Sequence, residues 1–98
     1  MTPYELTEVA EQDLKDLRGR VIETNGRKVA RKIVSELDET LSHLSDFPRM
    51  GRARPDLTDE TVFFFPFYSW LIIYEPDSVP LRVIRIASAY RDSKNLLT

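Results

Sequence analysis

One stretch decides how the domain closes: residues 82–92, which read RVIRIASAYRD. Its first half is rich in β-branched side chains, with Arg82 and Arg85 on either side of a Val-Ile pair, and this composition favours a strand over a helix. Tyr90 and Arg91 follow directly, so the strand delivers a phenol and a permanent cation to one edge of the domain. We therefore expect a functional site at the edge of the domain where this strand ends.

Two amphipathic helices precede that strand. Apolar residues recur every three or four positions after Thr7, a plausible N-cap, and Asn25 and Gly26 suit the end of a helix. A second stripe of the same spacing predicts a helix from Arg27 to Ser45. Because the connection is so short, the two helices should form an antiparallel hairpin. Their outer faces are strongly charged, which is typical of a solvated surface, with a partner-binding face as the alternative.

The remaining segments predict β-structure. A short strand from Tyr4 to Leu6 opens the chain, and β-branched and aromatic runs predict three more strands, over residues 61–65, 69–74 and 81–88. Pro66 has no N–H for a ladder, so it must lie at a turn or at a sheet edge. The order β-α-α-β-β-β predicts a single α+β domain over residues 1–98, in which the helical hairpin packs on an antiparallel sheet. For residues 92–97 we expect either a short last helix or a tail.

Aromatic residues are concentrated in the first two of these closing strands and the turn between them. Seven lie between residues 63 and 74, and they cannot all point inward because side chains alternate across a strand. We therefore expect some exposed aromatic surface, which often marks a binding face.

The segment between the helices and those strands, residues 47–57, is a turn-rich loop with three arginines. Phe47-Pro48 ends the second helix, because the residue before a proline is pushed out of the α region. Two interpretations stay open. In the first, Phe47, Met50 and Leu57 lie beneath the hairpin and the arginines point to solvent. In the second, the arginines form a patch for an anion or an acidic partner.

Composition argues against several classes of function. The chain has no cysteine and a single histidine, His43, so neither a disulfide framework nor a conventional zinc site is expected. The net charge is −2, whereas dedicated nucleic-acid binders usually have a strong basic excess. The first residues lack a signal-peptide pattern, and the longest apolar run is too short for a bilayer, so we expect a cytoplasmic protein. Without a P-loop, a GxGxxG, an HExxH or a Cys/His or Ser/His arrangement, we predict no catalytic residue, metal or cofactor.

Four motifs run along the chain: YxLTxxAxxDL at residues 4–14, FPxMGRxRPDL at 47–57, IIY at 72–74 and RIxxxxRD at 85–92. Their order and spacing resemble the ParE branch of the RelE/ParE toxin superfamily. The resemblance covers nearly the whole chain. It departs at Ser88, where many ParE-type sequences carry a histidine, since serine exchanges hydrogen bonds but cannot hold a cation near neutral pH.

The resemblance implies the toxin of a type II toxin–antitoxin system, a class associated with plasmid stabilisation. Such a toxin is neutralised by a ParD-like antitoxin, with which we expect a hetero-oligomer, and when free it is expected to bind and poison DNA gyrase. Two alternatives stay open, a ribosome-dependent mRNA endonuclease of RelE type and a non-toxic interaction module of the same fold. The slightly acidic charge, and two strands without lysine or arginine, favour a protein target over direct nucleic-acid binding.

Candidate contact residues follow from these observations. We predict that the target is bound by the closing segment, through Arg82, Arg85, Tyr90 and Arg91. We predict that the antitoxin is bound by the loop and the aromatic strand, through Arg49, Arg52, Arg54 and Trp70. The alternative for Arg85 is an internal ion pair with a carboxylate such as that of Glu75.

Overall fold

The computed structural model describes residues 3–88. In this part the chain forms β1 (Tyr4–Leu6), α1 (Glu8–Asn25), α2 (Arg27–Asp46), the 3-10 turn η1 (Pro48–Met50), β2 (Phe63–Phe67), β3 (Trp70–Glu75) and β4 (Leu81–Ser88). The predicted α+β order is confirmed. The short helix considered for residues 92–97 lies outside the described residues.

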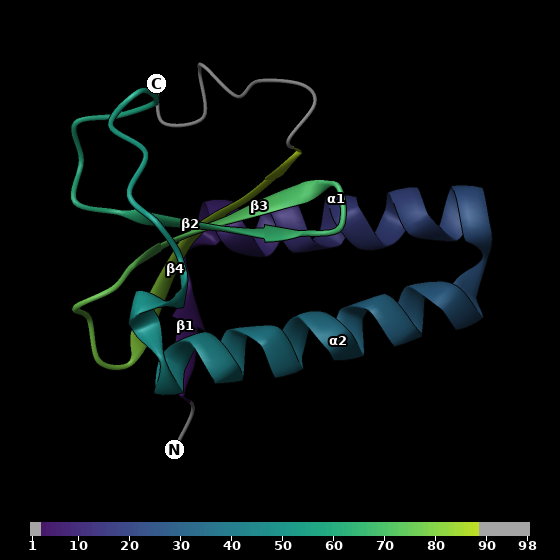
Figure 1. Ribbon diagram of the computed structural model, residues 1–98. Coiled ribbons are helices and arrows are strands. Elements are labelled where there is room, and N and C mark those ends of the chain that lie inside the picture. Colours follow the sequence, from purple (N-terminus) through teal and green to yellow (C-terminus); the bar gives the residue numbers. More distant parts are fainter. Residues whose placement is uncertain (1–2, 89–98) are drawn as a thin grey trace.

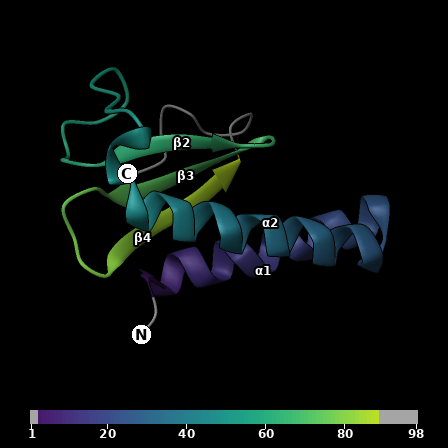
Figure 2. The same ribbon diagram turned by 60° about the horizontal axis from the view of Figure 1, so that its bottom comes forward.

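The helical hairpin forms where capping chemistry predicted it. The Thr7 side chain accepts a hydrogen bond from the Ala10 N–H, which caps α1. Gly26 is the single residue between the helices, and its φ of 90° is a conformation that glycine adopts without a Cβ penalty. The two helices run antiparallel, and their connection extends beyond the end of the sheet (Figures 1 and 2).

The sheet has the strand order β1-β4-β3-β2, so β4 is an inner strand. β2, β3 and β4 form the predicted antiparallel meander, whereas β1 pairs parallel to β4, with Tyr4 opposite Leu81. The sheet is therefore mixed rather than wholly antiparallel. The physical reason is that the hairpin returns the chain to the end where β1 began, so β2 runs in the direction of β1, and β4, two strands later, does so too.

The β2–β3 hairpin lies later in the chain than predicted, with β2 shifted by two residues from 61–65 and β3 shifted by one residue from 69–74. Phe67 pairs with Trp70, which leaves Tyr68 and Ser69 as the two-residue turn and puts Pro66 inside β2. Because β2 is an edge strand, Pro66 does lie at an edge of the sheet, as its missing N–H requires. Tyr68 has a φ of 53°, an uncommon conformation for a bulky residue.

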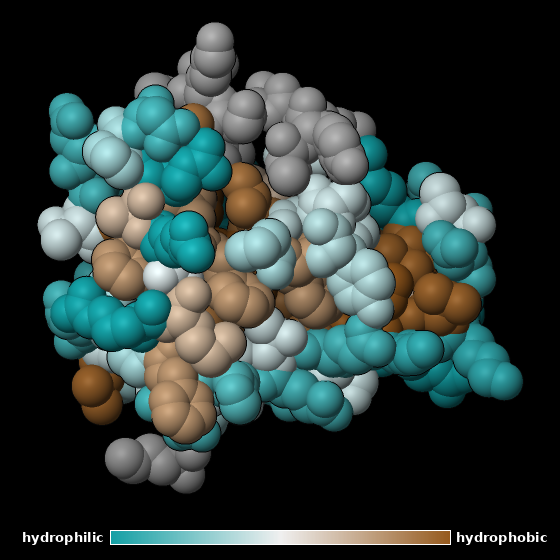
Figure 3. Space-filling view, viewed as in Figure 1, coloured by the Kyte–Doolittle hydropathy of each residue, from teal (hydrophilic) through white to brown (hydrophobic). Residues whose placement is uncertain are grey.

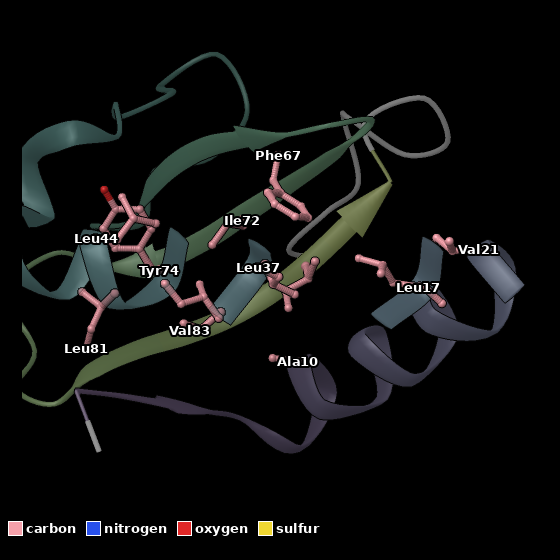
Figure 4. Packing of buried hydrophobic residues seen from close by; sticks show 13 residues of the cluster. Ala10, Leu17, Val21, Leu37, Leu44, Phe67, Ile72, Tyr74, Leu81 and Val83 are labelled. Carbon is pink, nitrogen blue, oxygen red and sulfur yellow. The ribbon is translucent and has the colours of Figure 1, made fainter. Parts of the chain in front are cut away.

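Apolar side chains cover both faces of the sheet. The main cluster lies between the sheet and the two helices, and Figure 4 shows Leu17, Leu37, Tyr74 and Val83 among its members. A smaller cluster on the opposite face contains Val62, Phe64, Ile73 and Ala87, against which Leu57 of the loop packs.

None of the three loop residues that the first interpretation placed beneath the hairpin lies there, since Leu57 packs on the opposite face of the sheet. Phe47 and Met50 are 57% and 42% exposed. The reason is that η1 begins directly after α2, so the Phe47 ring lies outside the core and contacts the ring of His43, with the centroids 5.2 Å apart.

Candidate protein-binding surfaces

The first turns of α1 hold the middle of β4, in a region that we call the α1–β4 junction. The register between β3 and β4 shifts beside Ile73, and Ile84 is the extra residue of a β-bulge. The Thr7 N–H donates to the Val83 carbonyl over 3.1 Å, and the Thr7 hydroxyl donates to the Ile84 carbonyl over 2.8 Å. The N-cap residue of α1 therefore also satisfies the backbone that the bulge frees.

Asp13 completes the junction from the second turn of α1. Its Oδ2 accepts from the Arg85 Nε over 2.9 Å and from the Ile86 backbone N–H over 3.0 Å, while its Oδ1 accepts from the Arg85 Nη2 over 3.2 Å. The Asp13 and Arg85 side chains are only 13% and 31% exposed, so this bidentate pair is shielded from solvent more than a surface ion pair is. It fixes the position of β4 relative to α1.

The internal ion pair considered for Arg85 therefore exists, but its partner is Asp13 and not Glu75. In the strand ladder it is Arg82 that lies opposite Glu75, and its Nε is 3.6 Å from the Glu75 Oε1. Of the four residues predicted to contact the target, Arg82 and Arg85 thus contact different elements, β3 and α1. Tyr90 and Arg91 lie outside the described residues. Target contact through these four side chains stays a prediction.

The arginine-containing loop is fixed to the sheet by Tyr74. The Tyr74 hydroxyl donates to the Pro48 carbonyl over 2.7 Å and accepts from the Gly51 N–H over 2.9 Å. Burial raises the pKa of this phenol. Arg52 and Phe64 exchange two backbone hydrogen bonds, so the loop also covers part of the outer edge of β2. We call these contacts of Tyr74 with Pro48 and Gly51 the loop clamp. It was not predicted from the sequence, although the glycine of the loop motif, Gly51, was a signal that two backbones approach closely there.

The three loop arginines do not form one patch. Arg49 pairs with Asp77 over 2.6 Å and stacks on the Phe63 ring, 5.3 Å from its centroid. Arg54 pairs with Asp56 through two hydrogen bonds and lowers the pKa of that carboxyl. Arg52 has no carboxylate partner among residues 3–88. All three are exposed, as a partner contact requires, and their part in antitoxin binding stays a prediction.

Trp70, the fourth residue predicted to contact the antitoxin, lies beside a groove at the end of the helical hairpin. This hairpin-tip groove has a volume of about 430 Å³, and its lining includes Val21 of α1, Ile33 of α2 and Tyr68 of the β2–β3 turn. The Tyr68 hydroxyl donates to the Glu36 carboxylate, which bridges the turn to α2 and raises the pKa of the phenol. Figure 3 shows apolar atoms exposed at this end of the molecule, between paler residues and charged ones.

Two features are absent from the part of the chain that the structure describes. No group of three or more His, Asp or Glu side chains among residues 3–88 could hold a metal ion. Neither α1 nor α2 combines the length and the apolar character needed to cross a membrane.

Comparison with known families assigns the chain. Residues 4–93 match the model of a family described as the ParE toxin of the type II toxin-antitoxin system parDE. The chain belongs to the ParE toxin family. A curated relative of this ParE-family chain, Toxin ParE3 of Caulobacter vibrioides, is 32% identical over 74 residues, which span 76% of this chain and 73% of the relative.

A solved structure has the same fold. It is described as the chromosomal ParDE TA system from P. aeruginosa, and it superposes with a TM-score of 0.72 over 87% of this chain and 92% of that chain, at 18% identity. The resemblance to the ParE branch is thus confirmed. Several residues that carry it have structural roles here, because Thr7, Asp13 and Arg85 build the α1–β4 junction and Gly51 and Tyr74 build the loop clamp.

Proposed function

We propose that this ParE-family toxin acts by binding a protein target, DNA gyrase, and that a ParD-like antitoxin holds it inactive by binding it. The observation that supports a binding mode over RNA cleavage is how the arginines after α2 are engaged. Arg49, Arg54, Arg82 and Arg85 each contact a carboxylate. Strands β2 and β3 carry no lysine or arginine. A surface that holds RNA phosphates needs several cations that are not already neutralised, and among the described residues after α2 only Arg52 has no carboxylate partner.

In this proposal the target is bound by Arg82 and by the residues to which β4 leads, Tyr90 and Arg91. The Asp13–Arg85 pair positions β4, which carries Arg82 and precedes Tyr90 and Arg91 in the sequence. A desolvated arginine contact to an acidic group contributes ~1.5–3 kcal/mol, or about tenfold to a hundredfold in affinity.

Arg91→Ala tests this role. We expect induced expression of the wild-type chain to arrest growth and the variant to relieve the arrest, with no change in the thermal unfolding midpoint. Wild-type arrest by the variant, at equal protein level, would exclude Arg91 from the target contact.

The target itself is tested in the same cells. Inhibited gyrase should leave broken, protein-linked DNA while transcripts stay intact, and co-expression of a ParD-like antitoxin should restore growth. Shortened transcripts on translating ribosomes, with intact DNA, would assign the chain to RelE-type chemistry. Normal growth without any antitoxin would leave only a non-toxic binding role.

A further inference from the structure

The outward face of α1 has a hollow near its middle, which we call the α1 hollow. Gly19 lies there, on the side of the helix opposite the buried Leu17 and Val21. A Cβ added at Gly19 would meet no atom within 4 Å, so the described chain leaves this face open. The hollow has a volume of about 470 Å³, and it is lined by Lys15, Asp16, Gly19, Arg20 and Glu23.

The charges around the α1 hollow cancel. Its lining holds two basic and two acidic side chains, so it presents no net charge to a ligand of one sign. Lys15 and Glu23 are exposed and form no ion pair with any residue between 3 and 88. They lie eight positions apart, which is twice the spacing at which side chains of one helix pair. Both charges are therefore available to a partner.

A second copy of the chain matches this arrangement. Lys15 and Glu23 are each four residues from Gly19, one on either side. When two α1 helices cross antiparallel at Gly19, a two-fold axis places Lys15 of one copy opposite Glu23 of the other, and the reverse pair forms as well. Because Gly19 has no side chain, the two helix axes can approach to about 8 Å, the short end of the usual range.

The wider charge distribution of the hairpin favours the same orientation. Residues 8–16 carry four acidic residues and one lysine, a balance of −3, whereas residues 20–28 carry three basic residues and one acidic residue, a balance of +2. In the antiparallel crossing, the acidic half of α1 in each copy lies beside the basic end of the hairpin in the other copy. A parallel crossing would place like charges together, so electrostatic complementarity selects the antiparallel pair.

We propose that α1 is a self-association surface, through which two copies of the chain form a two-fold symmetric dimer that crosses at Gly19 and contains two reciprocal Lys15–Glu23 pairs. The inference goes beyond the proposed function, because none of the residues predicted to contact the target or the antitoxin lies on α1. Exposed ion pairs each contribute little and a single helix crossing is small, so the dimer is weak and sensitive to salt.

Sedimentation equilibrium of the purified full chain measures this association. We expect a dimer with a dissociation constant on the order of 100 μM at about 0.05 M salt, and at least about fivefold weaker association at about 0.5 M salt. Lys15→Glu and Glu23→Lys should each weaken the dimer at least about tenfold, since two attractions become two repulsions. The control Glu60→Lys changes the net charge as Glu23→Lys does, but in an exposed loop, and should alter the association less than about twofold.

Two further samples separate this contact from other causes of a lost dimer. In an equimolar mixture of Lys15→Glu and Glu23→Lys, both contacts between the two variants again join opposite charges, so dimers should return to within about threefold of the wild-type affinity. Gly19→Gln fills the hollow and should weaken the dimer about tenfold. Its thermal unfolding midpoint should not fall, because glutamine favours a helix more than glycine does.

Several results would overturn the inference. They are a wild-type chain that stays monomeric up to about 1 mM at low salt, a dimer that neither charge reversal weakens, a mixture of the two variants that stays monomeric, and assembly that continues beyond the dimer. The proposed function is tested separately by growth arrest. A toxic chain that sediments as a monomer would therefore reject the dimer and keep the toxin.

Discussion

At the scale of single residues, the Tyr74 hydroxyl is the polar group that fixes the arginine-containing loop to the sheet. It satisfies one donor and one acceptor of the loop at a buried position. The loop in turn approaches so closely that a Cβ on Gly51 would lie 2.3 Å from this oxygen and 3.0 Å from the Phe64 carbonyl oxygen. Only glycine fits there, because the second neighbour is backbone and cannot move aside.

We expect Tyr74→Phe to destabilise the domain by ~1–3 kcal/mol, because the Gly51 N–H and the Pro48 carbonyl lose their shared partner. Gly51→Ala should cost at least about as much, through overpacking. Urea unfolding measures both. The same Ala substitution in the Tyr74→Phe background should cost less than in the wild type, since the nearest clashing atom is gone; strictly additive costs would show that the two groups do not interact.

At the scale of elements, two glycines of the hairpin differ in backbone conformation while neither is sterically crowded. An added Cβ meets no atom within 4 Å at Gly19 or at Gly26, but only Gly26 has a positive φ. Gly19→Ala should therefore stabilise α1 by ~0.5–1 kcal/mol through helix propensity. Gly26→Ala should destabilise the hairpin by ~1–2 kcal/mol through its left-handed backbone alone. Chemical denaturation of the pair checks this, and equal effects would contradict the conformational argument.

The contacts of the α1–β4 junction predict which variants of the target-binding arginines lose stability, and this affects how their toxicity is interpreted. Asp13→Ala should destabilise by ~3 kcal/mol, because it leaves the partly buried Arg85 without its carboxylate partner. Arg82→Ala, which removes one exposed contact to Glu75, should change stability by less than about 0.5 kcal/mol. Thermal unfolding distinguishes them. A loss of toxicity in an Arg85 variant thus reports on folding unless its stability is measured as well.

Helix positions could be predicted closely because their signals are local. The apolar spacing, the Thr7 cap and Gly26 fix α1 and α2, and only the last residue of α2 differs from the prediction. The parallel pairing of β1 with β4 could not be predicted in this way, because it joins residues 77 positions apart and depends on where the hairpin returns the chain. The partner of Arg85 was missed for the same reason, since Asp13 reaches it across 72 positions.

At the scale of the whole molecule, the phenols couple stability to alkaline pH. Burial and the Asp38 carboxylate, which accepts the Tyr4 hydroxyl over 2.5 Å, raise the pKa of Tyr4 to about 12. The pKa values of Tyr68 and Tyr74 are raised as well. An unfolded tyrosine titrates near pH 10, so between pH 10 and 12 the unfolded chain loses these protons first.

The stability that the raised pKa values provide is therefore complete below pH 10 and is lost as the pH rises toward 12. We expect the urea midpoint of the wild-type chain to fall over this range. Tyr4→Phe should have a lower midpoint at pH 8 and a flatter decline above pH 10, because its share of the titration is missing. Parallel declines of the two proteins would show that Tyr4 titrates normally in the fold.

The candidate sites were predictable only in part from the sequence. Residue types pointed to arginines and aromatics, but whether an arginine is available depends on tertiary neighbours such as Asp77 for Arg49. The hairpin-tip groove was not predicted, because the antiparallel hairpin is what brings Arg20 and Val21 beside Ile33. The groove also needs the β2–β3 turn as a third wall, which no local pattern encodes.

The inner position of β4 has a consequence for the synthesis of this toxin. Translation makes β1 and both helices first, yet the strand that joins β1 and α1 to the rest of the sheet is the last one to emerge from the ribosome. Until residues 81–88 are released, β1 has no strand to pair with, Asp13 lacks its contact with Arg85, and the hairpin covers an incomplete sheet. We therefore expect a chain that stops upstream of β4 not to fold, because it lacks the strand that joins β1 and α1 to β3 and β2.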